Sequence, residues 1–280
     1  MPGTLFLVST PIGNLEDITL RALRVLRDAN LIAAEDTRRT AKLLAHYAVA
    51  TPNTSFHEHN TRARLPQLLA RLERGEAVAL VTDAGTPGIS DPGVELVRAC
   101  VDRGIPVDPI PGPSAPLVAA LASGFPMEPL TIYGFAPARS KDRIAWLLRL
   151  ASVSHTLTFF EAPHRIRQTL KEASPLFGNR PMFVARELTK VHQELLRGTA
   201  ADLIGHITDP VGEFTVVAGP LLPSEPAETQ VSDQELWDEF GRSTANAGRR
   251  RRDIVAELAD KYGRSTNDVY AILERMKNGI

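Results

Sequence analysis

Charged residues follow a short apolar run at residues 31–34, which the pattern predicts to be a buried strand. Glu35 and Asp36 come directly after this run, and Arg38 and Arg39 follow them. Acids in such a place either begin a helix, where they meet the positive end of its dipole, or belong to a site where a carboxylate accepts a proton. The spacing leaves both interpretations open.

Two further charged segments follow predicted strands in the second half of the chain. The first contains Glu161, His164 and Arg165, and the second contains Glu187 and Lys190, with His192 close behind. A glutamate, a lysine and a histidine in one short segment could move a proton. Solvated surface is the alternative interpretation.

Metal chemistry has weak support in the sequence. His57 and His59 flank Glu58, but no third ligand follows at helical spacing, so we expect a polar loop near a site and no metal. Cys100 is the single cysteine, which excludes an internal disulfide and a cysteine-based metal cluster. We expect Cys100 to be a small core residue.

Three loops at the ends of predicted strands must position these groups. Residues 9–14, 82–93 and 111–116 are rich in Gly, Pro and small polar residues. If the strands are parallel, the loops share one sheet edge and form a single crevice. Such a crevice presents backbone groups and suits a neutral or zwitterionic ligand. The sequence has no G-x-G-x-x-G and no G-x-x-x-x-G-K, which disfavours a dinucleotide fold and a P-loop.

The remaining pattern predicts an α/β protein that consists of two α/β domains and a helical tail. Apolar runs predict strands at residues 4–8, 31–34, 77–81, 107–110, 130–135, 156–160, 182–185 and 213–218. Helices are expected between them at residues 20–26, 39–47, 92–101, 117–122, 142–150, 163–173 and 199–207. For the helix after residue 91 we expect Asp91 as N-cap, Pro92 in the first turn, and Val94, Leu96, Val97 and Val101 as the apolar face.

Composition and length agree with this division. The chain has 280 residues, 43% of them hydrophobic and 23% charged, and a formal net charge of -1. We expect domains at residues 1–124 and 125–222, and a linker with a helical domain at residues 223–280. No apolar run approaches a membrane span, and the expected location is the cytoplasm.

The tail resembles a helix-turn-helix. Arg249, Arg250, Arg251 and Arg252 begin its first predicted helix, and Thr266 is expected to cap the second. The arginines suit phosphate contacts, whereas a small helical appendage with a basic edge is the alternative.

Eight motifs together resemble a known family. In chain order they are STPIGNLEDITLRAL, AAEDTRRT, SFHEHN, LVTDAGTPGISDPG, PIPGPSA, YGFAP, FFEAPHRI and ARELTKVHQELLRG. They are similar to the motifs of the ribosomal RNA small subunit methyltransferase I family, which belongs to the tetrapyrrole methylase superfamily of class III S-adenosylmethionine-dependent methyltransferases. The resemblance covers residues 3 to 220, and the tail is similar to the small helical domain of many members.

The resemblance implies a two-domain α/β fold with S-adenosylmethionine in the cleft between the domains, and a homodimer. It implies methyl transfer to the ribose 2′-OH of a cytidine in the decoding region of 16S ribosomal RNA, within the small ribosomal subunit. When the family's cofactor contacts are transferred to the matching motif positions of this sequence, the resemblance implies contacts from Pro11, Asp83, Ala84, Gly85, Thr86, Ile89, Ser90, Pro113, Ser114, Ala115, Tyr133 and Phe135.

Methyl transfer requires that the donor methyl group be aligned with the acceptor oxygen and that a base accept the proton of the hydroxyl. Neither requirement calls for a metal. We expect the base to be Glu35, Asp36, Glu187 or Lys190, of which Lys190 would need a depressed pKa to be neutral. Arg38, His164, Arg165 and the tail arginines are expected to hold RNA phosphates. The alternatives are a methyltransferase of a tetrapyrrole or other small molecule, and a ribosome assembly factor without catalysis.

Overall fold

A computed structural model describes residues 1–88, 93–221, 232–245 and 250–277. The chain forms two compact units, Met1–Pro220 and Leu221–Ile280. The expected N-cap Asp91, the helix residue Pro92, the cofactor contacts Ile89 and Ser90, the tail residue Arg249 and most of the linker lie outside the described residues. No described helix is long and apolar enough to cross a membrane.

The first unit begins with a parallel sheet. Its strands are β1 (Leu5–Val8), β2 (Leu31–Ala34), β3 (Asn53–Ser55), β4 (Val78–Val81) and β5 (Val107–Ile110), in the order β3-β2-β4-β1-β5. Every pair is parallel. β2 and β4 are buried along their whole length, as expected of strands covered on both faces.

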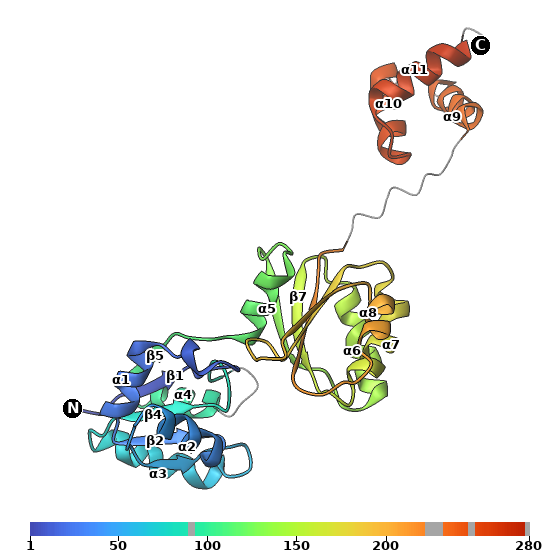
Figure 1. Cartoon of the computed structure of the whole chain (residues 1–280). Helices are drawn as coiled ribbons and strands as arrows, with labels where there is room; N and C mark the ends of the chain where they lie inside the picture. The colour runs from blue at the N-terminus through green and yellow to red at the C-terminus, as the bar shows by residue number, and fades with distance from the viewer. Residues whose placement is uncertain (89–92, 222–231, 246–249, 278–280) are drawn as a thin grey trace. The chain divides into compact units, whose positions relative to one another are not determined.

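Helices cover both faces of this sheet (Figure 1). One face packs against α1 (Leu20–Asp28) and α2 (Thr37–His46), and the other against α3 (Thr61–Glu73) and α4 (Gly93–Asp102). A short 3-10 helix, η1 (Leu15–Asp17), follows β1. Cys100 is fully buried in the α3/α4 core, where burial raises the pKa of its thiol to about 11, so the prediction of a core cysteine is confirmed.

The second sheet is mixed. Its strands are β6 (Leu130–Phe135), β7 (Thr156–Glu161), β8 (Met182–Arg186), β9 (Glu194–Gly198) and β10 (Phe214–Ala218), in the order β6-β7-β10-β8-β9. β6 and β7 are parallel, and the other pairs are antiparallel. Helices α6 (Ser140–Ala151), α7 (Ile166–Phe177) and α8 (Ala200–His206) cover one face, and α5 (Ala115–Ser123) packs on the other.

The unit Leu221–Ile280 has its own core. Helices α9 (Asp233–Ala245), α10 (Arg251–Lys261) and α11 (Thr266–Lys277) surround eight buried side chains: Leu236, Ile254, Val255, Leu258, Ala259, Val269, Ile272 and Leu273. The sequence pattern identified α10 and α11 and missed α9. The predicted cap Thr266 is wrong, because the Ser265 hydroxyl accepts the Asp268 amide at 3.1 Å.

Two strands were not predicted, and one predicted helix face differs from the structure. β3 and β9 are short edge strands without a long apolar run, which is why the sequence pattern did not predict them. The expected apolar face of α4 is partly wrong, because Val94 and Val101 are 57% and 65% exposed, whereas Leu96 is buried. Val94 and Val101 lie seven positions apart on the solvent side of that helix.

Candidate active site

The parallel sheet brings the three predicted loops together at one edge. The backbones of Thr10 and Gly85 exchange two hydrogen bonds of 2.9 and 3.0 Å. The Ser9 hydroxyl donates to the Thr86 hydroxyl at 3.1 Å, which donates to the Pro113 carbonyl at 3.2 Å. The loops after β1, β4 and β5 therefore form one hydrogen-bonded frame.

The β1 loop also contacts the second half of this unit. The Asn14 amide donates to the Thr189 hydroxyl at 3.1 Å. A Cβ at Gly13 would lie 2.5 Å from Lys190 Cγ and 2.8 Å from the Leu188 carbonyl oxygen, so only glycine permits this approach. Thr189 itself has a φ of 67°, a strained conformation for a β-branched residue.

A cavity of about 360 Å³ lies beside this frame. Its walls come from both halves of the unit Met1–Pro220, and the sequence-predicted residues among them are Glu35, Asp83, Ala84, Gly85, Thr86, Ser114, Ala115 and Phe135. The wall also contains Ile12, Arg39, Thr82, Phe160, Glu161 and Leu188, which lie in segments that the sequence pattern singled out, and Glu213, Phe214 and Thr215, which the sequence analysis missed. Several of these directly follow or precede a predicted strand end, which was the available signal.

Glu35 and Asp83 are joined at the cavity wall. The Asp83 amide donates to Glu35 Oε2 at 3.2 Å, and Asp83 Oδ1 accepts the Asp36 amide at 2.9 Å. Arg39 Nη1 lies 3.5 Å from Asp83 Oδ2. These contacts fix the ends of β2 and β4 against each other and hold two carboxylates beside the cavity.

Asp36 caps the N-terminus of α2. Its carboxylate accepts the Arg38 amide at 2.8 Å and binds the Arg38 guanidinium at 2.9 Å. Hydrogen bonds from the Arg38 side chain and backbone lower the pKa of Asp36 to about 2. A carboxylate with so low a pKa is a weak proton acceptor near neutral pH, which argues against Asp36 as the base.

Glu187 and Lys190 form an ion-pair cluster with Glu213. Lys190 Nζ lies 2.9 Å from Glu187 Oε1 and 3.0 Å from Glu213 Oε2. Burial acts to lower the pKa of Lys190, but its hydrogen bonds to the two glutamates outweigh burial and leave the pKa raised. Lys190 is therefore protonated, contrary to the neutral state that a base requires.

The buried carboxylate of Glu161 is paired with the partly exposed guanidinium of Arg165. Arg165 Nη2 lies 2.7 Å from Glu161 Oε1, and the same carboxylate accepts the Ala162 amide and the Thr169 hydroxyl. His164 is exposed beside this pair. Among the described residues, no group of three or more His, Cys, Asp and Glu could hold a metal ion.

The other predicted site residues lie apart from the cavity. Pro11 lines a neighbouring hollow, and the Tyr133 ring packs edge-on against Trp146 at 6.0 Å. In the second unit Arg250 pairs with Asp253, and Arg251 pairs with Glu274 at 2.7 Å. Arg252 is exposed. Their expected roles stay predictions.

Ser114 offers a test of the cavity. Its hydroxyl is buried in the wall and has no hydrogen-bond partner among the described residues. An unsatisfied buried hydroxyl is costly. We therefore expect Ser114→Ala to leave the unfolding free energy unchanged or raised by up to about 1 kcal/mol.

The same Ser114→Ala change should weaken ligand binding in the cavity roughly three- to tenfold, measured by calorimetric titration. Ser123→Ala is the control, because the Ser123 hydroxyl is already bonded to the Ala120 carbonyl. Unchanged ligand affinity would contradict the prediction.

Comparisons with known proteins agree with this architecture. The family model "Tetrapyrrole (Corrin/Porphyrin) Methylases" matches residues 4–204. The chain is 42% identical to a ribosomal RNA small subunit methyltransferase I from Synechocystis sp., over 96% of this chain and 97% of that protein. It is 48% identical to the protein of that name from Thermotoga maritima, over 77% of this chain and 97% of that protein.

Solved structures share the fold. A uroporphyrin-III C-methyltransferase from Thermus thermophilus, complexed with S-adenosylhomocysteine, is 20% identical with a TM-score of 0.55, over 78% of this chain and 97% of that chain. A diphthine synthase is 13% identical with a TM-score of 0.62, over 78% of this chain and 90% of that chain.

Proposed function

The chain belongs to the tetrapyrrole (corrin/porphyrin) methylase family, and from this we propose that it is a ribosomal RNA methyltransferase of the small subunit. It transfers the methyl group of S-adenosylmethionine to a ribose 2′-OH of 16S ribosomal RNA. The observation that carries the proposal is the high identity, over nearly the whole chain, to relatives with that name. The finer assignment, a cytidine in the decoding region, rests on the motif resemblance alone.

The cavity has the chemistry that S-adenosylmethionine requires. Its volume of about 360 Å³ suits a small-molecule ligand. Phe135 and Phe160 offer aromatic surface for a purine, and the Ser114 hydroxyl offers an unused hydrogen-bonding group. The carboxylates of Glu35 and Asp83 suit a cationic ligand. When bound, S-adenosylmethionine supplies an electrophilic methyl group on a sulfonium.

We propose Glu35 as the general base. Of the four sequence candidates, it is the one that lines the cavity. Asp36 has a low pKa and Lys190 is protonated, and Glu187 is bonded to Lys190. The hydrogen bond from the Asp83 amide orients the Glu35 carboxylate, which would accept the proton that the ribose hydroxyl loses.

A homodimer in the cytoplasm is part of the same proposal. Leu117 and Leu121 on α5 are 47% and 71% exposed, and they lie on the side of the helix opposite the buried Ala119 and Ala120. An exposed apolar strip of this kind suits contact with a second copy of the chain. The strip supports the proposal without identifying the interface.

The proposal is tested with methyl-labelled S-adenosylmethionine and small ribosomal subunits that lack the modification. Nuclease digestion and nucleoside analysis should place the label in a 2′-O-methylated nucleoside, with 2′-O-methylcytidine expected. Cofactor binding without any labelled RNA would reject the proposal and favour a small-molecule substrate. RNA binding without release of S-adenosylhomocysteine would instead favour an assembly factor.

A further inference from the structure

A second, smaller cavity adjoins the first. It has a volume of about 160 Å³ and lies between α2 and the β1 loop. Arg39, Thr82 and Asp83 line both cavities. Only these shared residues would therefore separate a group bound in the smaller cavity from a ligand in the larger cavity.

Two cations, the Asp83 carboxylate and several apolar side chains line the smaller cavity. Arg39 and Lys42 supply the positive charge, and Pro11, Leu15 and Leu43 supply the apolar surface. Lys42 is exposed and makes no ion pair with any described acid. Arg39 is 61% exposed and lies 3.5 Å from Asp83, so the guanidinium has donors left for a further anion.

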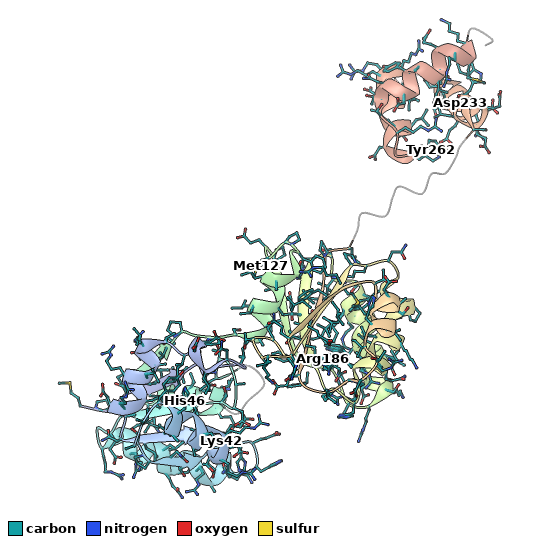
Figure 2. The ribbon with its side chains drawn as sticks, viewed as in Figure 1. Lys42, His46, Met127, Arg186, Asp233 and Tyr262 are labelled. Carbon is teal, nitrogen blue, oxygen red and sulfur yellow. The ribbon has the colours of Figure 1, made fainter. Side chains whose placement is uncertain are left out.

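Basic side chains continue along one side of α2. Arg38, Lys42 and His46 follow each other at intervals of four residues, which places them in one row on the helix surface. Figure 2 labels Lys42 and His46 on this helix. Arg38 is bound to Asp36, so Lys42 is the cation of the row that lines the cavity and is not neutralised by a described carboxylate.

We propose that the smaller cavity is the subsite for the target ribonucleotide, with Lys42 and Arg39 binding its flanking phosphate. This inference rests on the proposed function, because the substrate must enter beside the cofactor cavity. RNA is a polyanion, so its entrance requires cations. The apolar wall suits the face of a base or ribose. Phosphate contacts to Lys42 would place the ribose hydroxyl toward the shared wall, where the Asp83 amide is hydrogen-bonded to the Glu35 carboxylate.

The test measures binding of unmodified small ribosomal subunits to the full chain by filter retention at several salt concentrations. Lys42→Glu should weaken binding at least tenfold, and Lys42→Arg should stay within about threefold of the wild type. The slope of log affinity against log salt should fall by about 1 in Lys42→Ala. Lys171→Ala, which removes an exposed lysine of α7 outside both cavities, is the matched control.

A separate titration measures S-adenosylmethionine affinity, which should stay within twofold in every Lys42 variant. If Lys42→Glu binds the subunits with the same affinity as the wild type, the inference is overturned, whereas the proposed methyltransferase function is not affected. Loss of cofactor affinity in Lys42→Glu would overturn it too, because the smaller cavity would then serve the cofactor. If the wild-type protein neither binds nor labels subunits, the proposed function and the inference both fail.

Discussion

Replacing Glu35 by glutamine is expected to lower kcat for RNA methylation by roughly 10²- to 10⁴-fold, the usual contribution of a general base. Glutamine keeps a carbonyl oxygen that can accept the Asp83 amide, so the wall between β2 and β4 should survive. Cofactor affinity should therefore change little. The measurement is single-turnover labelling of small ribosomal subunits, with cofactor binding measured in parallel by calorimetry.

Glu58→Gln is the matched control for this prediction. Glu58 is an exposed glutamate in the loop after β3 and lines neither cavity, so its replacement should leave kcat within twofold. The variants Asp36→Asn and Glu187→Gln address the other carboxylate candidates. If Glu35→Gln turns over at the wild-type rate and one of these variants does not, the base is the other carboxylate.

The order of the strands in the chain was predictable, because each central strand is a continuous apolar run. The central strand β2 and the edge strands β5 and β6 match their predicted bounds, and the central strands β1 and β4 differ by one residue. Apolar runs report burial on both faces of a sheet. β3 and β9 lie at sheet edges, where one neighbouring strand suffices and an apolar run is unnecessary.

The site was predictable as a set of loops and not as a set of contacts. Gly, Pro and small polar residues after the strands indicated where backbone is shaped for a ligand. The state of each charged group depends on a partner far along the chain, as Lys190 shows. Its pKa is raised by hydrogen bonds to Glu187 and to Glu213, and a fold must first bring Glu213 to that place.

Arg143→Met is expected to lower the unfolding free energy of the first unit by about 3–5 kcal/mol, because it breaks a buried ion pair. Arg143 on α6 and Glu172 on α7 join at 2.7 Å, and both side chains are almost completely buried. Arg143 also donates to the carbonyls of Pro137 and Ala138. Without it, the buried Glu172 carboxylate keeps only its neutral donors Ser140 and Gln168, and two carbonyls lose the Arg143 donor. Urea unfolding followed by circular dichroism measures the loss.

Two companion variants distinguish the ion pair from simple packing. Arg149→Met, at an exposed position of the same helix, should cost less than about 0.5 kcal/mol. Arg143→Met combined with Glu172→Leu should recover most of the stability, because no buried charge is left unpaired. A double variant as unstable as Arg143→Met alone would contradict an electrostatic origin of the loss.

The pH dependence of the same pair follows from the pKa of Glu172. Burial acts to raise this pKa, but hydrogen bonds from Arg143, Gln168 and Ser140 outweigh burial and leave it lowered. A carboxyl whose pKa is lower in the folded state stabilises the fold above its unfolded pKa, and this stability is lost as the pH falls through the folded value. The wild type should therefore lose stability on acidification more steeply than the double variant, which lacks this carboxyl. Parallel urea unfolding of both proteins from neutral to acidic pH tests this, and equal slopes would show that Glu172 does not contribute to acid unfolding.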